Sequence, residues 1–217
     1  MDPLEPAAVR VLGSLIEKKL ATPDNYPLTL KSLMAACNQT SNRDPVMDLD
    51  ETAVLRALDE LGHRSWARKV HRSDARVTRY RENIGETLHL HPPELAILSV
   101  LLTRGPQTVG EIKSRTNRLF DFIDLSHVEI TLDSLAELST PLVTGLPRRP
   151  GQKEVRWAHL LAGTPEVDQT DPVEPAEESS PEAAGDRIGA LEVEVASLRK
   201  EVAELREELD AFRSQFE

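Results

Sequence analysis

Apolar residues near the start of the chain recur with the spacing of a helix that buries one face. They occupy positions i, i+3, i+4, i+7 and i+8, which lie along a single stripe of an α-helix. The stripe consists of Ala8, Val11, Leu12, Leu15 and Ile16. This pattern predicts a first helix, which is expected to end before Pro23.

Two further helices are predicted before residue 63. The sequence LTLKSLMAAC indicates a short second helix, and the irregular segment NQTSNRDP follows it. A third helix is expected from about Asp50, with Gly62 placed to cap its C-terminus. The apolar face of this third helix consists of Val54, Leu58 and Leu61.

The stretch from His63 to Arg81 predicts a basic β-hairpin. Two extended runs, SWARKV and RVTRYR, flank the turn-forming pair Ser73–Asp74. Seven Lys or Arg residues stand here against the single acid Asp74. These basic residues are Arg64, Arg68, Lys69, Arg72, Arg76, Arg79 and Arg81.

The same order of elements is expected again from residue 92. An apolar helix over residues 92–105 is followed by a short helix that opens with a Thr108/Glu111 capping box. A second capping box, Ser126/Glu129, is expected to start the next helix.

A second hairpin, over residues 142–160, completes the repeated pattern. Its basic residues are Arg148, Arg149, Lys153 and Arg156. At a constant offset of 77 residues, Leu55, Leu58, Glu60, Leu61 and Arg79–Tyr80 match Leu132, Leu135, Glu137, Leu138 and Arg156–Trp157. This coincidence across a helix and a strand indicates an internal repeat.

Three helices followed by a hairpin are the elements of a winged helix. The sequence therefore predicts a mainly α fold with small β-hairpins (α+β). It is expected to contain two tandem winged-helix domains, residues 1–85 and residues 86–163. The hairpins would be the wings.

Two long stretches closely resemble the bacterial YceH-like family of uncharacterised proteins. They are SLIEKKLATPDNYPLTLKSLMAACNQTSNRDPVMDL and LLTRGPQTVGEIKSRTNRLFDFIDLSHVEITLDSLA, and the resemblance covers about residues 5–163. The elements NYPLT, ACNQ and NRDPVM are its most specific parts. The resemblance implies tandem winged-helix domains and supplies no catalytic residue.

The last quarter of the chain differs from the rest. Residues 164–184 are rich in Pro, Glu, Asp and Ser, which predicts an extended, disordered acidic linker. Residues 185–217 carry apolar side chains at alternating spacings of three and four, which predicts a coiled coil that forms a homodimer. The seam consists of Ile188, Leu191, Val195, Leu198, Val202, Leu205, Leu209, Phe212 and Phe216.

Charges beside this seam favour a parallel pair of helices. A parallel dimer would bring together residues of opposite sign, whereas an antiparallel dimer would bring together residues of like sign. The expected pairs are Arg187–Glu192, Glu194–Arg199, Glu201–Arg206 and Glu208–Arg213. A single amphipathic helix that packs against its own domain is the alternative, but it would need no such matching.

Charge is divided unevenly between these regions. Residues 1–163 hold 21 Lys+Arg and 21 Asp+Glu, and residues 164–217 hold 5 and 16, so the whole net charge of -11 comes from 5 − 16 in the last quarter. The basic hairpins therefore belong to a neutral part of the chain. Their Lys and Arg residues are candidates for contacts with DNA phosphates, although such residues also keep exposed strands soluble and unpaired.

The third helix of each repeat is acidic instead. Residues 48–60 contain one base, Arg56, and residues 121–138 contain none. Base readout in the major groove normally uses Arg, Lys, Asn or Gln, so docking of these helices in the groove is not expected. Their acids are Asp48, Asp50, Glu51, Asp59, Glu60, Asp121, Asp124, Glu129, Asp133 and Glu137.

Two functions remain open from the sequence. The first is a dimeric DNA-associated regulatory protein that contacts the phosphate backbone of duplex DNA through its basic wings. The alternative is a protein–protein adaptor or scaffold, similar to the tandem winged-helix accessory subunits of chromosome-condensation complexes. The sequence favours the first slightly.

Other kinds of chemistry find little support in the sequence. We expect no enzyme, because phosphate loops, nucleophile elbows and paired catalytic carboxylates do not appear. We expect neither a cofactor nor a metal, since His89, His91 and the other histidines lack the spacing of a metal site. No membrane-spanning or secretory segment is recognisable, and Cys37 is the single cysteine, so a cytoplasmic protein is expected.

Overall fold

The computed structural model describes residues 2–70, 77–148 and 154–164. These residues form seven α-helices, one short 3-10 helix (Pro23–Asn25) and two three-stranded antiparallel sheets. They lie in one compact unit, Met1–Val167. The expected mixture of helices with small antiparallel sheets is confirmed. The predicted acidic linker and heptad seam lie outside the described residues.

The first repeat begins with helix α1 and ends with a hairpin. Strand β3 lies between β1 and β2, and Tyr80 pairs with Leu28 on one side and with Lys69 on the other. The two expected strands of the hairpin therefore pair, whereas its expected turn at Ser73–Asp74 lies outside the described residues. The short strand β1 was not expected. The elements are α1 (Pro6–Ala21), β1 (Leu28–Thr29), α2 (Leu30–Cys37), α3 (Glu51–His63), β2 (Ala67–Val70) and β3 (Arg79–Glu82).

The second repeat has the same order of elements and the same sheet topology. Strand β6 lies between β4 and β5. The elements are α5 (Pro92–Arg104), β4 (Gln107–Thr108), α6 (Val109–Thr116), α7 (Leu125–Ala136), β5 (Val143–Gly145) and β6 (Arg156–His159). A short helix that the sequence did not predict, α4 (Ile84–Thr87), connects the two repeats and contains the expected domain boundary after residue 85.

Two of the predicted helix starts are confirmed. The Asp50 side chain accepts a hydrogen bond from the Ala53 N–H at 2.7 Å and caps α3. Thr108 and Glu111 form the expected capping box at the start of α6, in which each side chain accepts a hydrogen bond from the other residue's backbone N–H.

Two other predicted helix ends are wrong. Asp124, and not Ser126, caps α7, because its carboxylate accepts the His127 N–H at 2.8 Å; an acid here also interacts favourably with the helix dipole. Gly62 does not end α3, which continues to His63. The residue that turns the chain out of this helix is Ser65, with φ of 59°.

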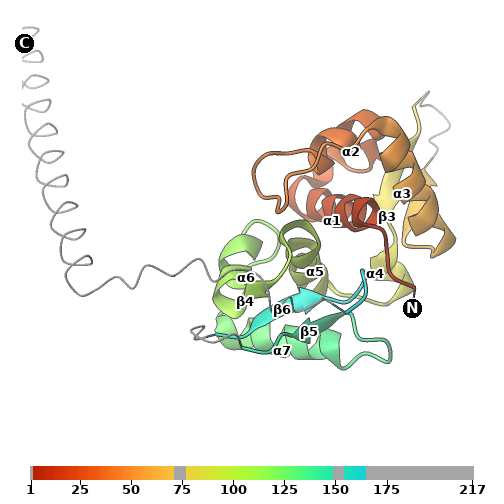
Figure 1. Ribbon diagram of the computed structural model, residues 1–217. Coiled ribbons are helices and arrows are strands. Elements are labelled where there is room, and N and C mark those ends of the chain that lie inside the picture. The colour runs from red at the N-terminus through yellow and green to blue at the C-terminus, as the bar shows by residue number, and fades with distance from the viewer. Residues whose placement is uncertain (1, 71–76, 149–153, 165–217) are drawn as a thin grey trace, which may run out of the picture. The chain divides into compact units, whose positions relative to one another are not determined.

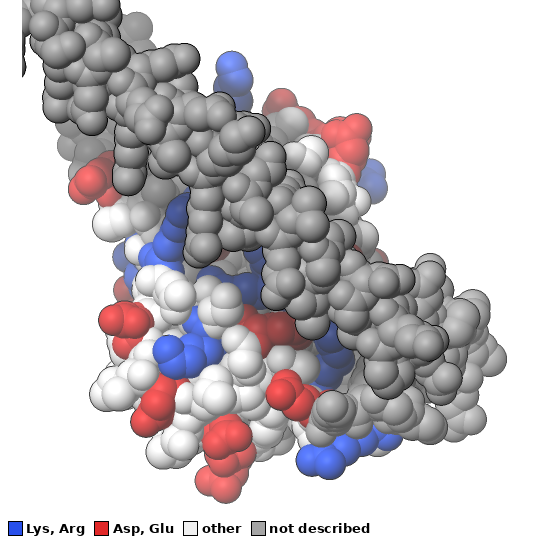
Figure 2. All heavy atoms as spheres, turned by 90° about the vertical axis from the view of Figure 1, so that its left-hand side faces the viewer, with Lys and Arg blue, Asp and Glu red and all other residues white. Residues whose placement is uncertain are grey.

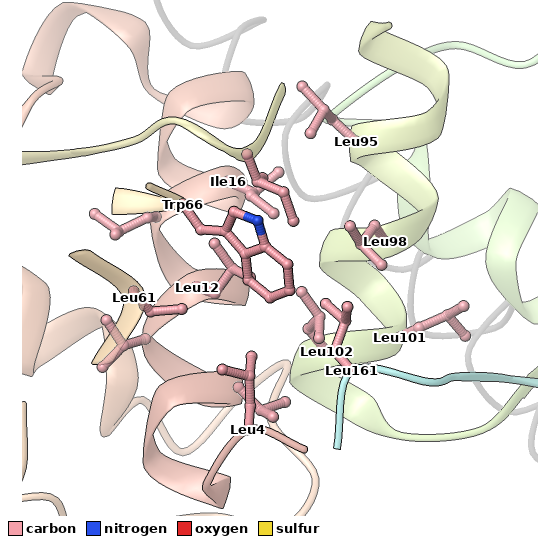
Figure 3. Packing of buried hydrophobic residues seen from close by; sticks show 14 of the residues in the cluster. Leu4, Leu12, Ile16, Leu61, Trp66, Leu95, Leu98, Leu101, Leu102 and Leu161 are labelled. Carbon is pink, nitrogen blue, oxygen red and sulfur yellow. The ribbon is translucent and has the colours of Figure 1, made fainter. Parts of the chain in front are cut away.

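One hydrophobic core runs through both repeats. Helix α1 packs extensively against α5, and the two helices lie side by side (Figure 1). Trp66, which is only 3% exposed, reaches in among leucines of α1 and α5 (Figure 3). This tryptophan therefore anchors the first hairpin to the core and does not face solvent.

The N-terminal segment also joins the two repeats. The Leu4 N–H donates a hydrogen bond to the Leu161 carbonyl at 2.7 Å, and both side chains are buried in the shared core. The first residues of the chain thus pack beside the last residues of the second repeat. The contacts between α1 and α5 and this hydrogen bond fix the faces that each repeat leaves exposed.

Candidate functional site

The first basic hairpin lies partly within the described residues. Arg64 follows α3, Arg68 and Lys69 are on β2, and Arg79 and Arg81 are on β3. Arg72 and Arg76 fall outside the described residues. Five of the seven predicted bases are therefore among the described residues.

Arg79 and Arg81 hold the hairpin to the rest of the first repeat. The Arg79 guanidinium donates to the Pro27 carbonyl at 2.7 Å, next to β1. Arg81 forms an ion pair with Glu86 in α4 and hydrogen bonds to the neighbouring Asn83 side chain. Donors used in this way are less available to a phosphate.

Arg64 and Lys69 pair with acids of α3. Arg64 lies 3.7 Å from Glu60 and stacks over the Trp66 ring, with its guanidinium carbon 5.4 Å from the ring centre. Lys69 lies 3.8 Å from Asp59. Such partly exposed pairs are weak, on the order of 0–1 kcal/mol, so a strong competing anion would displace them. In the free protein they nevertheless reduce the positive charge of the hairpin.

A groove of about 500 Å³ separates α3 from the first hairpin. Leu58, Ala67 and Tyr80 contribute buried apolar surface to its floor. Asp59 and Lys69 lie on opposite walls and form the ion pair across it. The groove therefore carries both signs of charge and has no strong preference for a polyanion.

The predicted bases of the second hairpin also differ in whether they contact other groups of the protein. Arg156 donates to the Pro106 carbonyl at 2.9 Å and lies 3.4 Å from Glu111, so it joins β6 to the start of α6. Arg148 is exposed, whereas Arg149 and Lys153 fall outside the described residues. Within the described residues, only Arg68 and Arg148 of the predicted bases are exposed without a carboxylate within 4.0 Å.

Helices α3 and α7 present acids to solvent. Some of these acids have a structural role, since Asp50 and Asp124 are helix caps. Glu129 and Asp133 are exposed on α7, and Glu137 is exposed directly after it; among the described residues, none of these three carboxylates caps a helix. A face of this kind repels phosphates.

The described atoms on the face drawn in Figure 2 form no large basic area. Figure 2 shows Lys and Arg interspersed with Asp and Glu among the described atoms of this face. Neither sign forms a continuous patch there. Binding through a broad electropositive surface therefore finds no support on this side of the molecule.

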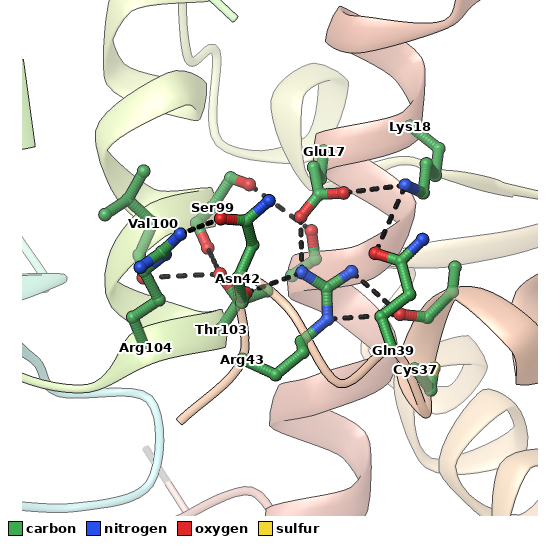
Figure 4. A network of polar contacts seen from close by, with 12 residues as sticks. Glu17, Lys18, Cys37, Gln39, Asn42, Arg43, Ser99, Val100, Thr103 and Arg104 are labelled. Carbon is green, nitrogen blue, oxygen red and sulfur yellow. Dashed lines mark hydrogen bonds and ion pairs between the residues drawn. The ribbon is translucent and has the colours of Figure 1, made fainter. Parts of the chain in front are cut away.

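A buried network of charged side chains was missed by sequence reasoning. Arg43 lies in the irregular segment between α2 and α3, and its side chain is 0% exposed. It donates to the Ala36 carbonyl at 2.7 and 3.1 Å and pairs with Glu17 of α1 at 2.6 Å (Figure 4). Arg10 donates to the Cys37 carbonyl at 3.2 Å and to the Pro45 carbonyl at 2.6 Å.

These two arginines satisfy the last carbonyls of α2. The C-terminal carbonyls of a helix lack partners within the helix and carry its partial negative charge, which favours cations there. The irregular segment is held from the other side by α5, because the Asp44 N–H donates to the Thr103 carbonyl at 2.9 Å and Arg104 bonds to Asn42. The network thus fixes the connection that leads into α3.

Burial shifts the pKa values of groups in this network. Burial alone would raise the pKa of Glu17, but the hydrogen bonds and charges of Arg43 and Lys18 together outweigh it, so the pKa of this carboxyl lies below its usual value. Burial and the neighbouring Arg43 lower the pKa of Arg10. Burial raises the pKa of the Cys37 thiol to about 11. Cys37 is therefore a protonated core residue and a poor nucleophile.

The sequence contained a partial signal for this network. Arg43 and Pro45 stand in the NRDPVM element, which has no periodicity of its own and is one of the most specific parts of the family resemblance. Its specificity is now explained by packing: Arg43 and Pro45 both contact the buried polar groups between α1 and α2. The element therefore has a structural role.

The remaining titratable groups give little support to a catalytic or metal site. In the described ranges, no three His, Cys, Asp or Glu side chains are grouped in a way that would hold a metal ion. His127 packs edge-on against Phe120 and Phe122, with ring centres 5.8 and 5.1 Å away. Burial lowers the pKa of His159 to about 4, so this ring is neutral at physiological pH.

Comparison with other proteins identifies the family. A family model described as "Protein of unknown function, DUF480" matches residues 4–152. A UPF0502 protein of Geobacter sulfurreducens is 55% identical over 217 residues, which cover 99% of this chain and 98% of the relative. The chain belongs to the DUF480/UPF0502 family. Its members in Geobacter metallireducens (52% identical, 99% and 98% covered) and Geotalea uraniireducens (51% identical, 96% and 96% covered) are similar along nearly the whole chain.

Membership of an uncharacterised family, which the resemblance implied, is confirmed. The names of these UPF0502 relatives state no activity, ligand or partner. The described part of this family member contains no helix that is both long enough and apolar enough to cross a lipid bilayer.

Proposed function

We propose that this DUF480/UPF0502 protein is an adaptor that binds segments of other proteins, with two tandem winged-helix domains as its scaffold. The order helix, strand, helix, helix, hairpin occurs twice, which supports the winged-helix assignment. In this proposal the third helix of the second repeat, α7, offers a surface to a protein partner and not to a DNA groove.

The observation that carries the proposal is the chemistry of the α7 surface. Ile130 is 68% exposed at the centre of this helix, and Asp133 and Glu137 are exposed beside it. Large apolar side chains gathered on an exposed surface mark a contact with a protein or a membrane. The acids make a polyanion an unfavourable partner, because they would face the phosphates.

Site-specific photocrosslinking tests the adaptor function. A photoreactive amino acid at position 130 of the full-length protein is expected to capture a defined partner in the host cells, and the same group at exposed position 24 serves as the control. The captured protein, once purified, should bind the wild-type chain directly. Capture that is equal at both positions, or a purified partner that does not bind, would contradict the proposal.

Contact with the DNA backbone through the first hairpin is the second candidate. Arg68 is exposed beside Lys69 on β2, and Arg72 and Arg76 follow in the sequence. If this candidate is right, duplex DNA of mixed sequence should bind, with an affinity that falls steeply between about 50 and 200 mM salt. Arg68→Glu should lower that affinity for every sequence. Binding of this kind, at physiological salt, would overturn the adaptor proposal.

We also propose that the heptad residues of the tail join two chains in a parallel homodimer. The support comes from the sequence pattern alone, since the tail lies outside the described residues. A dimer would double the number of partner segments that one molecule holds. Two linked sites of modest affinity bind a bivalent partner much more tightly than either does alone.

A further inference from the structure

Helix α7 carries a shallow depression of about 390 Å³ on its outer face. Its lining residues are Ile130, Asp133, Ser134, Glu137 and Leu138. The first three are spaced i, i+3 and i+4, so they share one face of α7, and the last two directly follow the end of the helix at Ala136. A shallow surface of this shape suits a second helix or an extended segment laid along the C-terminal half of α7.

The depression is electrically negative. Asp133 and Glu137 are exposed on its wall, and a further carboxylate lies beneath it, because Ser134 donates a hydrogen bond to the buried Glu94 at 2.9 Å. Glu94 itself is held at the start of α5 by the His91 N–H at 2.7 Å. Residues 121–138 contain no Lys or Arg to offset these charges.

The exposed apolar residues of the described chain are concentrated at this helix. Five large apolar side chains are exposed among all the described residues, and three of these five belong to α7 or to the segment that leads into it. Ile123 is 83% exposed, Leu125 50% and Ile130 68%. Acids and aliphatic side chains are therefore presented by the same element, which differs from an ordinary solvated face.

We infer that α7 docks a Lys/Arg-rich amphipathic segment of another protein, whose aliphatic side chains cover Ile130 and whose cations pair with Asp133 and Glu137. This inference rests on the proposed adaptor function and adds the chemistry of the partner. The acids Asp133 and Glu137 favour cations on the partner, and the exposed Ile130 favours a partner segment with an apolar side.

Other occupants fit this surface less well. A second copy of the chain related by a two-fold axis would bring the acidic surface that carries Asp133 and Glu137 against the same acidic surface, which is repulsive. The chain's own tail, residues 186–217, carries 5 Lys+Arg and 9 Asp+Glu, so its net charge of 5 − 9 = -4 has the wrong sign. Nucleic acid has the wrong sign as well.

A designed peptide serves as the probe. It is a fluorescent amphipathic helix of about 18 residues, or five turns, with Leu on one side and Lys on the other. Two further peptides are compared with it: one in which Glu replaces every Lys, and one with the same composition in a shuffled order. Fluorescence anisotropy with the full-length protein is expected to show binding of the Leu/Lys helix at low salt and much weaker binding of the other two.

Variants of the helix surface locate the binding site. Ile130→Asp is expected to weaken binding of the Leu/Lys helix at least about tenfold, as expected for the central anchor of a small interface. Asp133→Asn together with Glu137→Gln should weaken it about fivefold and reduce its dependence on salt. The matched controls are Val46→Asp, at another exposed apolar residue, and Asp24→Asn with Asp48→Asn; both should bind like the wild type.

Several results would overturn the inference. Binding of the Leu/Glu or shuffled peptide as tight as that of the Leu/Lys helix contradicts it, and so does wild-type affinity in Ile130→Asp. So would a smaller assembly of Ile130→Asp than of the wild type in sedimentation, because it would show that α7 joins two copies of the chain. Thermal melts confirm that the exposed substitutions leave the fold intact. If photocrosslinking identifies a genuine partner that still binds Ile130→Asp, the adaptor function stands and only the assignment to α7 fails.

Discussion

The backbone of Gly13 in α1 lies directly against Leu102 in α5. A β-carbon at Gly13 would stand 2.8 Å from the Leu102 β-carbon and 2.9 Å from a methyl carbon of Thr103. The Ser99 hydroxyl also donates to the Gly13 carbonyl at 3.4 Å. The two repeats are therefore joined by a close contact between helices that leaves no room for a side chain at residue 13.

Gly13→Ala is expected to destabilise the protein, although alanine favours helix more than glycine does. The added methyl group would push α1 away from α5, and overpacking of this kind costs about 1–3 kcal/mol. Urea unfolding followed by circular dichroism measures the change in the free energy of unfolding. Gly62→Ala is the matched control, because a β-carbon there meets nothing within 4 Å and should raise stability by about 0.5–1 kcal/mol. Changes of the same sign in both variants would show that helix propensity, and not the contact with Leu102, decides the outcome.

Arg43→Met should be among the most damaging single substitutions in the first repeat. It leaves the buried Ala36 carbonyl without its donor, and an unsatisfied buried acceptor costs about 1–3 kcal/mol. It also removes one of the two cations that pair with the Glu17 carboxylate, whose other partner is Lys18 at 2.9 Å. Arg43→Lys should recover only part of this loss, because an ammonium cannot reproduce the planar fork of the guanidinium. The free energy of unfolding in urea is the measurement. The exposed Arg56→Met should change it by no more than about 0.5 kcal/mol, and a similar effect of Arg43→Met would refute the structural role of the network.

His159 should remain neutral at acidic pH. Its pKa is lowered by burial from 6.5 to about 4, so the unfolded chain takes up a proton at this residue before the folded chain does. The contribution of this residue to stability is therefore complete above pH 6.5 and is lost as the pH falls from there towards about 4. Proton NMR titration of the ring, with the exposed His89 as a reference in the same spectra, measures the pKa directly. A midpoint of His159 near 6.5 would show that the ring is solvated.

Removal of residues 168–217 should leave a folded monomer, because Met1–Val167 is a compact unit. The full-length chain should sediment as a dimer if the tail forms the predicted coiled coil. Leu198→Lys with Leu205→Lys, in the full-length protein, would place charges in the seam and should give monomers without shortening the chain. A full-length chain that remains monomeric at tens of micromolar concentrations would reject the dimer.

Local patterns in the sequence determined most of the helices and both hairpins. Ala8, Leu12 and Ile16 are buried as their spacing requires, and the Thr108/Glu111 capping box forms as expected. Periodicity and capping involve residues only a few positions apart, so a single sequence contains the information. The same locality explains why the repeated order of elements was visible at a fixed offset.

The tertiary structure alone decided which partner each long side chain meets. Arg79 donates to the Pro27 carbonyl, 52 positions away in the sequence, so a base that the hairpin pattern predicted to contact DNA also helps to hold the sheet together. Arg43 is buried against α1 and α2, and no local pattern marked it as a core residue. The exposure of Ile130 likewise depends on how α7 packs against the rest of the second repeat. These outcomes come from contacts between distant segments, whose geometry is set by packing of the whole core and not by any short stretch of sequence.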